Sequence, residues 1–267
     1  MRSKAFRAVL WFAAGAVFLF SAVMVLKYHV EMRAGARQTE ALVQSAVVQP
    51  SAQPLPVPSE APSAAPQPTA EAAADDPYPL PIEVDFDVLK AQNPDVAAWL
   101  YCPDTLIHYP VVQTTDNETY LTRLFDGSKN PAGTLFLDYR NAADLHDRNS
   151  IIYGHNMNND SMFGTLTEYA SQAYYDAHPT FYLLTPQANY VVHIFAGFVT
   201  AGDDELYNAL SADEATQTRL LRDWLSASDF TAAFTPSAQD RLLLLSTCSY
   251  EYNDARYIVI GVLQEVS

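Results

Sequence analysis

The chain has 267 residues, of which 49% are hydrophobic and 17% charged, and its 15 basic and 31 acidic side chains give a formal net charge of −16. This excess of acid argues against a nucleic-acid partner, because phosphate binding depends on lysine and arginine releasing counterions. Two cysteines exclude a scaffold built on disulfides, and the apolar fraction is sufficient for a packed core.

The amino-terminal segment has the composition of a membrane anchor. Residues 8–26 form a run of 19 residues without a charge, and a helix of this length spans about 28 Å, close to the hydrocarbon thickness of a bilayer. Arg2, Lys4 and Arg7 precede the run, which favours a cytoplasmic position for residues 1–7, although basic residues also follow it and weaken this orientation. A cleaved signal peptide is the alternative, but its apolar region is usually shorter. We expect a single-pass protein of the cell membrane whose remaining chain is extracellular.

Residues 27–81 are predicted to be a juxtamembrane segment and a linker. From Gln38 to Asp76 there is no aromatic residue, Gly, Lys or Arg, and ten of the seventeen prolines fall between Pro50 and Pro81. Such a composition cannot bury enough apolar surface to offset the entropy of ordering the chain. We expect a Pro/Ala-rich spacer, partly polyproline II, that holds a domain away from the membrane, or a neutral spacer with no partner.

Residues 82–267 are predicted to be one domain. Short apolar or alternating runs rich in Val, Ile, Tyr and Phe recur in this part, separated by Asn, Asp, Gly and Pro, as expected of strands. Eight such runs predict a mostly β fold with helices, in the form of a closed barrel or a sandwich. The predicted strands are Ala97–Tyr101, Leu106–Val112, Thr134–Tyr139, Ser150–Tyr153, Thr180–Leu184, Tyr190–Thr200, Leu242–Thr247 and Arg256–Leu263.

Two helices accompany these strands. Asp85–Gln92 has a helical pattern that an Asn-Pro pair ends. Between the sixth and seventh strands, Ser211 and Glu214 have the spacing of a capping box, and apolar residues at helical spacing follow, which predicts a helix of roughly fifteen residues. The four consecutive leucines at 242–245 predict a strand that is buried on both faces.

Three polar residues at predicted strand ends form a candidate site. Cys248 ends the strand of four leucines, Arg256 opens the next strand, and His155 ends an earlier apolar run. Cysteine can supply a thiolate, histidine can transfer a proton, and arginine can donate hydrogen bonds to a developing oxyanion. We expect the three to converge at one barrel rim facing outward from the bilayer. The alternative is that Cys248 is a buried small hydrophobe and His155 a structural residue.

Several motifs over about residues 82–267 resemble the sortase family, the cysteine transpeptidases of Gram-positive bacterial surfaces, and most closely its class B. The motifs occur in the order found in the family. They are Asn93-Pro94-Asp95-Val96-Ala97-Ala98-Trp99-Leu100, Tyr109-Pro110-Val111-Val112-Gln113, Asp116-Asn117-Glu118-Thr119-Tyr120-Leu121, Gly133-Thr134-Leu135-Phe136-Leu137-Asp138-Tyr139-Arg140, Tyr153-Gly154-His155-Asn156-Met157, and Leu245-Ser246-Thr247-Cys248 followed by Arg256.

The resemblance implies a closed eight-stranded β-barrel with an N-terminal helix and a helix inserted before the cysteine strand. It implies that Cys248 attacks the Thr carbonyl of a Leu-Pro-x-Thr-Gly-like sorting motif in a secreted protein. His155 would protonate the leaving amine, and Arg256 would hold the oxyanion or the substrate backbone. An amine of a peptidoglycan precursor or stem peptide would then resolve the thioester, with no cofactor. Four further residues would bind substrate: Asn117, Leu121, Ser246 and Thr247.

Three alternatives to wall anchoring stay open: a thiol hydrolase or protease of surface proteins, a pilin-polymerising transpeptidase, and a non-catalytic surface assembly protein. No metal site is expected, because the remaining histidines lack metal-ligand spacing. Cys102 is predicted to be an ordinary semi-buried thiol. Solvated loop acids are preferred over a cation site at Asp138, Asp144, Asp147 and Asp160, and Asp254 is also predicted to be a solvated loop acid.

Overall fold

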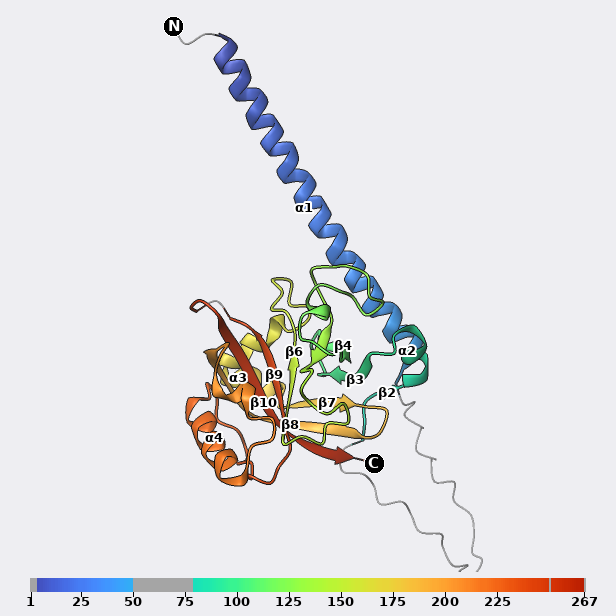
Figure 1. Ribbon diagram of the computed structural model, residues 1–267, viewed down its shortest axis with the longest axis vertical. Helices are drawn as coiled ribbons and strands as arrows, with labels where there is room; N and C mark the ends of the chain where they lie inside the picture. The colour runs from blue at the N-terminus through green and yellow to red at the C-terminus, as the bar shows by residue number, and fades with distance from the viewer. Residues whose placement is uncertain (1–3, 50–78, 250, 267) are drawn as a thin grey trace, which may run out of the picture.

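A computed structural model describes residues 4–49, 79–249 and 251–266. Its main body is a closed β-barrel from which one long helix extends (Figure 1). All eight predicted strands are present, and their bounds differ from the predicted ones by at most three residues at either end. They are β3 (Val96–Tyr101), β4 (His108–Val112), β5 (Leu135–Leu137), β6 (Asn149–Tyr153), β7 (Thr180–Leu184), β8 (Asn189–Ala201), β9 (Leu242–Cys248) and β10 (Ala255–Val266).

The barrel closes in the order β10-β8-β7-β3-β4-β5-β6-β9. The pairs β4–β5 and β6–β9 are parallel, and the other neighbouring pairs are antiparallel. A parallel pair needs a long crossover connection, and β6 reaches β9 through β7, β8 and the inserted helix. Because β6 and β9 run side by side in the same direction, the residues that end them lie at the same end of the barrel.

The inserted helix is present as α4 (Glu214–Ala227), but the predicted capping box is wrong. The N-cap is Asp213, whose Oδ1 accepts a hydrogen bond from the backbone N–H of Thr216 at 2.7 Å. A carboxylate directly before the first turn satisfies a free amide there, and Ser211 lies two residues outside the helix. The opening helix α2 (Phe86–Gln92) agrees with its prediction, with Asp85 as its N-cap.

Residues 164–177 contain two short helices that the sequence did not predict. A 3-10 helix covers Gly164–Ala170, and α3 covers Gln172–Ala177. Each is too short to show an amphipathic repeat, and helices of this length depend on tertiary packing. Tyr169 and Tyr175 supply that packing, because both are buried in the interior of the barrel. Two further 3-10 helices cover Thr119–Leu121 and Glu205–Asn208.

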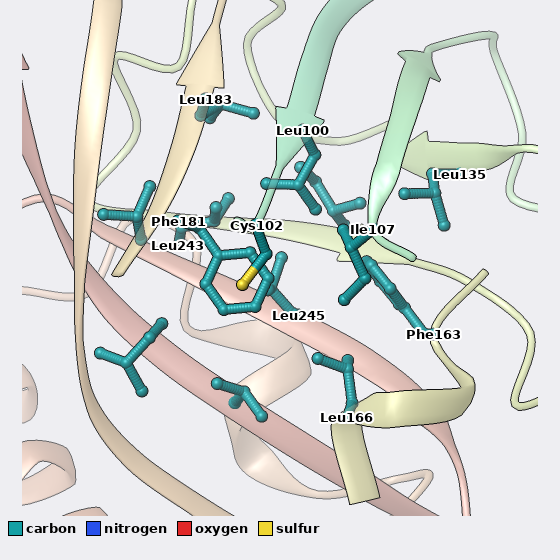
Figure 2. Packing of buried hydrophobic residues seen from close by; sticks show 14 of the residues in the cluster. Leu100, Cys102, Ile107, Leu135, Phe163, Leu166, Phe181, Leu183, Leu243 and Leu245 are labelled. Carbon is teal, nitrogen blue, oxygen red and sulfur yellow. The ribbon is translucent and has the colours of Figure 1, made fainter. Parts of the chain in front are cut away.

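The four leucines of β9 are buried on both faces, as predicted. Leu243 and Leu245 belong to the cluster inside the barrel, together with Cys102 (Figure 2). Leu242 and Leu244 belong to a second cluster on the outside, where α4 contributes Trp224. The inserted helix therefore packs on the outer face of the barrel, mainly against β8, in the same cluster as Leu242 and Leu244 of the strand that carries Cys248.

The predicted spacer does not begin at Gln38. Helix α1 runs without interruption from Lys4 to Ala46, and β1 (Val47–Val48) follows it and pairs with β2 (Glu83–Val84) in a small antiparallel sheet. Leu42, 3% exposed, and Ala46 are buried among residues of α2. Residues 38–46 contain neither Pro nor Gly, so nothing in them ends a helix, and this apolar face gives the helix a partner. The rest of the predicted spacer, residues 50–78, lies outside the described residues.

Candidate active site

The ends of β6, β9 and β10 bring the predicted catalytic residues to one place. In the parallel pair, Tyr153 lies opposite Ser246, so His155 and Cys248 follow at matching positions beyond the two strands. In the antiparallel pair, Arg256 lies directly opposite Cys248. The expectation that the loop between β9 and β10 returns Arg256 to the thiol therefore agrees with the register.

These strand ends open into a pocket of about 330 Å³. Cys248, His155 and Arg256 all line it, and each side chain is partly accessible to solvent. The four residues expected to bind substrate also line it: Asn117, Leu121, Ser246 and Thr247. Six other lining residues had been given no role in the site, although four of them lie in the family motifs: Phe136, Arg140, Tyr153, Gly154, Gly202 and Tyr207.

The His155 imidazole is oriented by the loop that carries Leu121. Its Nε2 lies 2.7 Å from the backbone oxygen of Leu121, and because a carbonyl can only accept, Nε2 carries the proton of this bond. Gly133 packs against the ring on the other side of the same loop. A Cβ atom there would lie 3.2 Å from His155 Cδ2 and 2.6 Å from the backbone oxygen of Tyr120, and φ is +65°, so both space and backbone conformation require glycine.

Hydrogen bonds across β6 and β9 hold the histidine turn against the cysteine strand. Thr247 Oγ1 donates to the backbone oxygen of Gly154 at 2.9 Å, and the Asn156 side chain donates to the backbone oxygen of Cys248 at 2.8 Å. Ser246 Oγ lies 2.9 Å from the hydroxyl of Tyr207. Ser246 and Thr247 are buried, so both hydroxyls are engaged in holding the pocket together.

Arg256 is paired with a residue for which the sequence predicted a different role. Its Nη2 lies 2.7 Å from Asp254 Oδ1, and its Nη1 donates to the backbone oxygen of Ala255 at 3.1 Å. Asp254 is thus an ion-pair partner rather than a lone solvated acid, although its side chain remains 57% exposed. No sequence pattern shows this pairing, because it depends on the directions of two side chains at the end of a turn; the backbone at Asp254 is left-handed, with φ of +62°.

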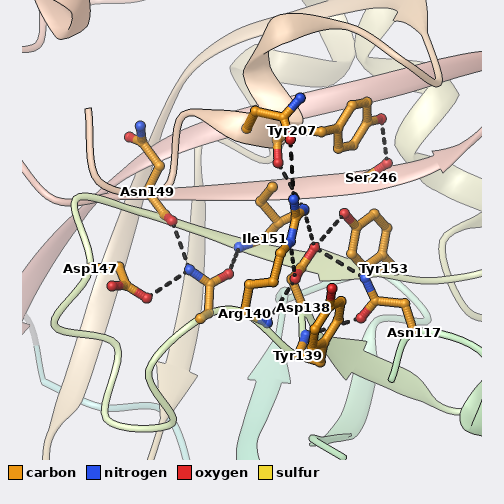
Figure 3. Close-up of polar contacts among 12 residues, drawn as sticks. Asn117, Asp138, Tyr139, Arg140, Asp147, Asn149, Ile151, Tyr153, Tyr207 and Ser246 are labelled. Atoms are coloured by element: carbon orange, nitrogen blue, oxygen red, sulfur yellow. Dashed lines mark hydrogen bonds and ion pairs between the residues drawn. The ribbon is translucent and has the colours of Figure 1, made fainter. Parts of the chain in front are cut away.

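Asp138 organises the opposite wall of the pocket and was predicted wrongly as a solvated loop acid (Figure 3). Its side chain is fully buried and accepts hydrogen bonds from the Arg140 guanidinium at 2.8 and 2.9 Å, from the Tyr153 hydroxyl at 2.9 Å and from Asn117 Nδ2 at 3.1 Å. Arg140 also donates to the backbone oxygen of Tyr207. One carboxylate therefore fixes three side chains that line the pocket.

The charge state of Asp138 follows from these contacts. Burial by itself would raise the pKa of a carboxyl group. The hydrogen bonds from Arg140 and Tyr153 outweigh burial and hold the pKa of Asp138 below its ordinary value. Burial, together with the adjacent carboxylate, raises the pKa of Tyr153, so this tyrosine stays a neutral donor. Asp138 is therefore negatively charged at neutral pH, and the side chains of the pocket wall are held around this charge.

No three His, Cys, Asp or Glu side chains gather as a metal site within residues 4–49, 79–249 and 251–266. Asp147, one of the acids weighed for a cation, accepts hydrogen bonds from Asn141 and from the backbone of Ala142. Asp144 and Asp160 are exposed.

Comparison with known proteins decides the family. The sortase domain model matches residues 100–264. The chain belongs to the sortase family, class B. Sortase B of Listeria monocytogenes is 38% identical over 181 residues, which cover 66% of this chain and 72% of that protein. The crystal structure of Staphylococcus aureus sortase B superposes with a TM-score of 0.64 at 26% identity, covering 68% of this chain and 87% of that one. That of Clostridium perfringens sortase B gives 0.63 at 28%, covering 68% and 100%.

Members of the sortase family are cysteine transpeptidases, and this class B chain is an enzyme of that kind. The barrel, its N-terminal helix and its additional helices match the sortase B structures, so the predicted fold class is confirmed. Sortases act on secreted proteins that carry sorting motifs, and on amine acceptors.

Proposed function

We propose that this sortase cleaves a Leu-Pro-x-Thr-Gly-like motif with Cys248 as nucleophile, His155 as proton donor and acceptor, and Arg256 as oxyanion ligand. The observation that carries the proposal is that all three side chains line one pocket at the ends of β6, β9 and β10. A thiol, an imidazole and a guanidinium supply the three functions that acyl transfer from an amide requires.

The reaction proceeds in two balanced steps. The thiolate of Cys248 forms a bond to the Thr carbonyl carbon, the carbon–nitrogen bond to Gly breaks, and the leaving amine takes a proton from His155. The acceptor amine then attacks the thioester and loses a proton to His155, and the thiolate is released. Arg256 stabilises the tetrahedral oxyanion in both steps, because its charge is permanent and its planar fork is preorganised for oxygen.

The substrate backbone enters between the Asn117–Leu121 segment and the strand that carries Cys248. Leu121 is exposed at the pocket edge, where an apolar motif residue can cover it. Asn117 is held by Asp138 and by the backbone N–H of Tyr139, so its orientation is set before a substrate arrives. A preorganised polar group costs less entropy on binding than a mobile one.

The acceptor is an amine of a peptidoglycan precursor or stem peptide, and the enzyme is held in the cell membrane by α1. Within the described residues, one helix is long and apolar enough to cross a bilayer, and its apolar part lies near the N-terminus. The basic residues that precede it favour a cytoplasmic N-terminus and an extracellular catalytic domain.

Incubating the full chain with a motif peptide, with and without an added amine, tests this function. We expect cleavage between Thr and Gly, a Cys248 thioester that accumulates without amine, and an amide product when amine is present. Cleavage that is indifferent to the amine would favour the hydrolase alternative. A chain that releases pilin-like polymers in preference to wall-linked product would favour the polymerising one.

A further inference from the structure

We propose that Asp254 is a positioning residue for Arg256. Its carboxylate, seated against Gly202, orients the guanidinium towards the oxyanion that forms when Cys248 attacks a carbonyl. The inference rests on the role of Arg256 proposed above. It adds that this arginine depends on a second residue of the same turn for its orientation.

The strands fix the backbone of Arg256 but do not fix its side chain. Arg256 lies opposite Cys248 of β9 and opposite Thr200 of β8, so its backbone is held between two strands. The backbone N–H of Ser249 donates to the oxygen of Ala255 at 2.8 Å and closes the turn. An arginine side chain has several rotatable bonds, and it loses considerable entropy when it is held in one conformation. A partner for the guanidinium is therefore needed to hold it beside the thiol.

Asp254 is such a partner. Asp254 Oδ1 lies 2.7 Å from Arg256 Nη2, and Arg256 Nη1 donates to the backbone oxygen of Ala255 at 3.1 Å. The side chain of Arg256 is 29% exposed and that of Asp254 is 57% exposed, so the pair is accessible to solvent. A guanidinium carries five N–H donors. The contacts with these two residues can occupy two of them, which leaves donors for an oxyanion.

Gly202 provides the space in which the carboxylate is held. A Cβ atom at Gly202 would lie 2.5 Å from Asp254 Oδ2 and 2.8 Å from both Oδ1 and Cγ of the same carboxylate. The backbone N–H of Gly202 also donates to the backbone oxygen of Asp254 at 2.9 Å. Gly202 directly follows β8 and lines the active-site pocket. The carboxylate is therefore seated on one residue and paired with another, so the fold sets its direction and that of the guanidinium.

The turn itself does not require a negative charge at position 254. The backbone there is left-handed, with φ of +62°, a conformation that Asn, Asp and Gly adopt readily. Asn or Gly would form the same turn without adding to the net negative charge of the chain, which is −16. A partly exposed ion pair also contributes little to stability. The specific contribution of the carboxylate is thus to the guanidinium that it orients.

The carboxylate has two opposing effects on an oxyanion bound by Arg256. It repels the negative charge of the oxyanion, but solvent weakens this repulsion because Asp254 is largely exposed. It also holds the guanidinium in place before the reaction, and preorganised donors stabilise a developing oxyanion without reorganising during the step. We expect orientation to outweigh repulsion, so removal of the charge should lower kcat. KM should change little, because the oxyanion is absent from the bound substrate.

Two substitutions disturb the contact in different ways. Asp254→Asn keeps the shape of the side chain and its left-handed preference, and removes its charge. Gly202→Ala keeps the charge and displaces the carboxylate. Asp104→Asn is the matched control, because Asp104 is an exposed aspartate with φ of 60° in the turn between β3 and β4. Cleavage of the motif peptide by the full chain gives kcat and KM for each variant.

We expect Asp254→Asn and Gly202→Ala each to lower kcat about tenfold and to change KM less than about twofold. The control should change neither quantity. Gly202→Ala should cause less than about a twofold further loss when it is added to Asp254→Gly, because the carboxylate that it displaces is then absent. A purely structural role of Gly202 would cause the same loss in both backgrounds.

An unchanged or raised kcat in Asp254→Asn would overturn the inference, and so would a change confined to KM or an equal loss in the control. A loss from Gly202→Ala that persists in the Asp254→Gly background would also contradict it. Arg256→Lys separates the inference from the proposed function. If Arg256→Lys is impaired and Asp254→Asn is not, the inference alone fails. If Arg256→Lys retains full activity, the proposed role of Arg256 fails as well.

Discussion

The two cysteines of this sortase lie in contrasting regions of one barrel. Cys102 is 1% exposed in the interior, surrounded by Leu100, Phe181 and Leu245 (Figure 2), and burial raises the pKa of its thiol to about 12. Cys248 is partly exposed at the rim, opposite Arg256 and on the wall of a pocket. The same type of side chain is therefore a packing residue in one region and a candidate nucleophile in the other, because the two sites differ in solvent exposure and in neighbouring charge.

The largest effect is expected when the thiol at the rim, that of Cys248, is removed. Cys248→Ala should lower kcat/KM for peptide cleavage at least about a thousandfold, as loss of a covalent nucleophile does. It should change the free energy of unfolding by less than about 0.5 kcal/mol, because the side chain is small and partly exposed. Peptide cleavage and urea denaturation measure the two quantities. Residual cleavage close to that of the parent chain would place the nucleophile elsewhere.

The next effect tests the charge beside the rim thiol. Arg256→Lys keeps a positive charge but loses the planar fork, and we expect kcat to fall about a hundredfold, the usual cost of losing an oxyanion donor. Arg222→Lys on the exposed face of α4 is the matched control and should have no effect, since Arg222 is 75% exposed and pairs with its neighbour Asp223 in a surface salt bridge. Equal activity in both variants would remove Arg256 from the mechanism.

A third variant tests whether Asp138, although buried, contributes to the active-site rim. Asp138→Asn leaves the Arg140 guanidinium without its anion, and we expect a loss of about 2–3 kcal/mol in the free energy of unfolding at pH 7. Because the folded-state pKa of Asp138 is lowered, its stabilisation is present above the unfolded value near 3.9 and is lost as the pH falls through the native value. Urea denaturation at pH 7 and pH 3 should therefore show the difference between the two chains shrinking at low pH.

Activity distinguishes this role of Asp138 from a purely structural one. Since Asn117 and Tyr153 would lose their common partner, KM should rise about tenfold with a smaller change in kcat. Tyr153→Phe removes only one of the donors to Asp138 and should show the same trend with a smaller loss of stability. An unchanged KM in both variants would confine Asp138 to stabilising the fold.

The smallest effect on activity is expected in the interior. Cys102→Ala should leave peptide cleavage within about twofold and cost about 1–2 kcal/mol of stability, because a small buried side chain is truncated. In the native parent chain one thiol should react with an aromatic disulfide reagent, and the second should react only after unfolding. Two rapidly reacting thiols would show that burial does not protect Cys102.

The rim was recognisable in the sequence because its residues stand directly after or before strong strand patterns. Cys248 follows four leucines, and Arg256 opens an equally apolar run, so local pattern predicts that both lie at strand ends, and the family resemblance then implies their catalytic roles. Asp138 also follows an apolar run, but its role could not be assigned in the same way. Its partners Asn117 and Tyr153 lie 21 and 15 residues away, and no local pattern links them.

In the amino-terminal part, the composition of each segment is evident from the sequence, but the contacts of helix α1 with the barrel domain are not. The charge-free run and the proline-rich stretch are both evident in the sequence, and together they predict a flexible tether. The structure replaces the first part of that tether with helix, because Leu42 and Ala46 find buried partners in α2 that composition cannot reveal. The pairing of Val47–Val48 with Glu83–Val84 likewise joins segments separated by more than thirty residues.

By itself, the sequence determined the eight strands, helices α2 and α4, the family and the three candidate catalytic residues, since each depends on short-range periodicity or on a contiguous motif. Only the tertiary structure decided that Asp138 supports the pocket wall, that Asp254 pairs with Arg256, and that α1 packs directly onto the barrel. The Asp138 network and the packing of α1 depend on contacts between distant segments, whose free energy depends on burial and geometry that arise only when the barrel closes. Asp254 and Arg256 are close in sequence, but their pairing depends on side-chain geometry that no sequence pattern shows.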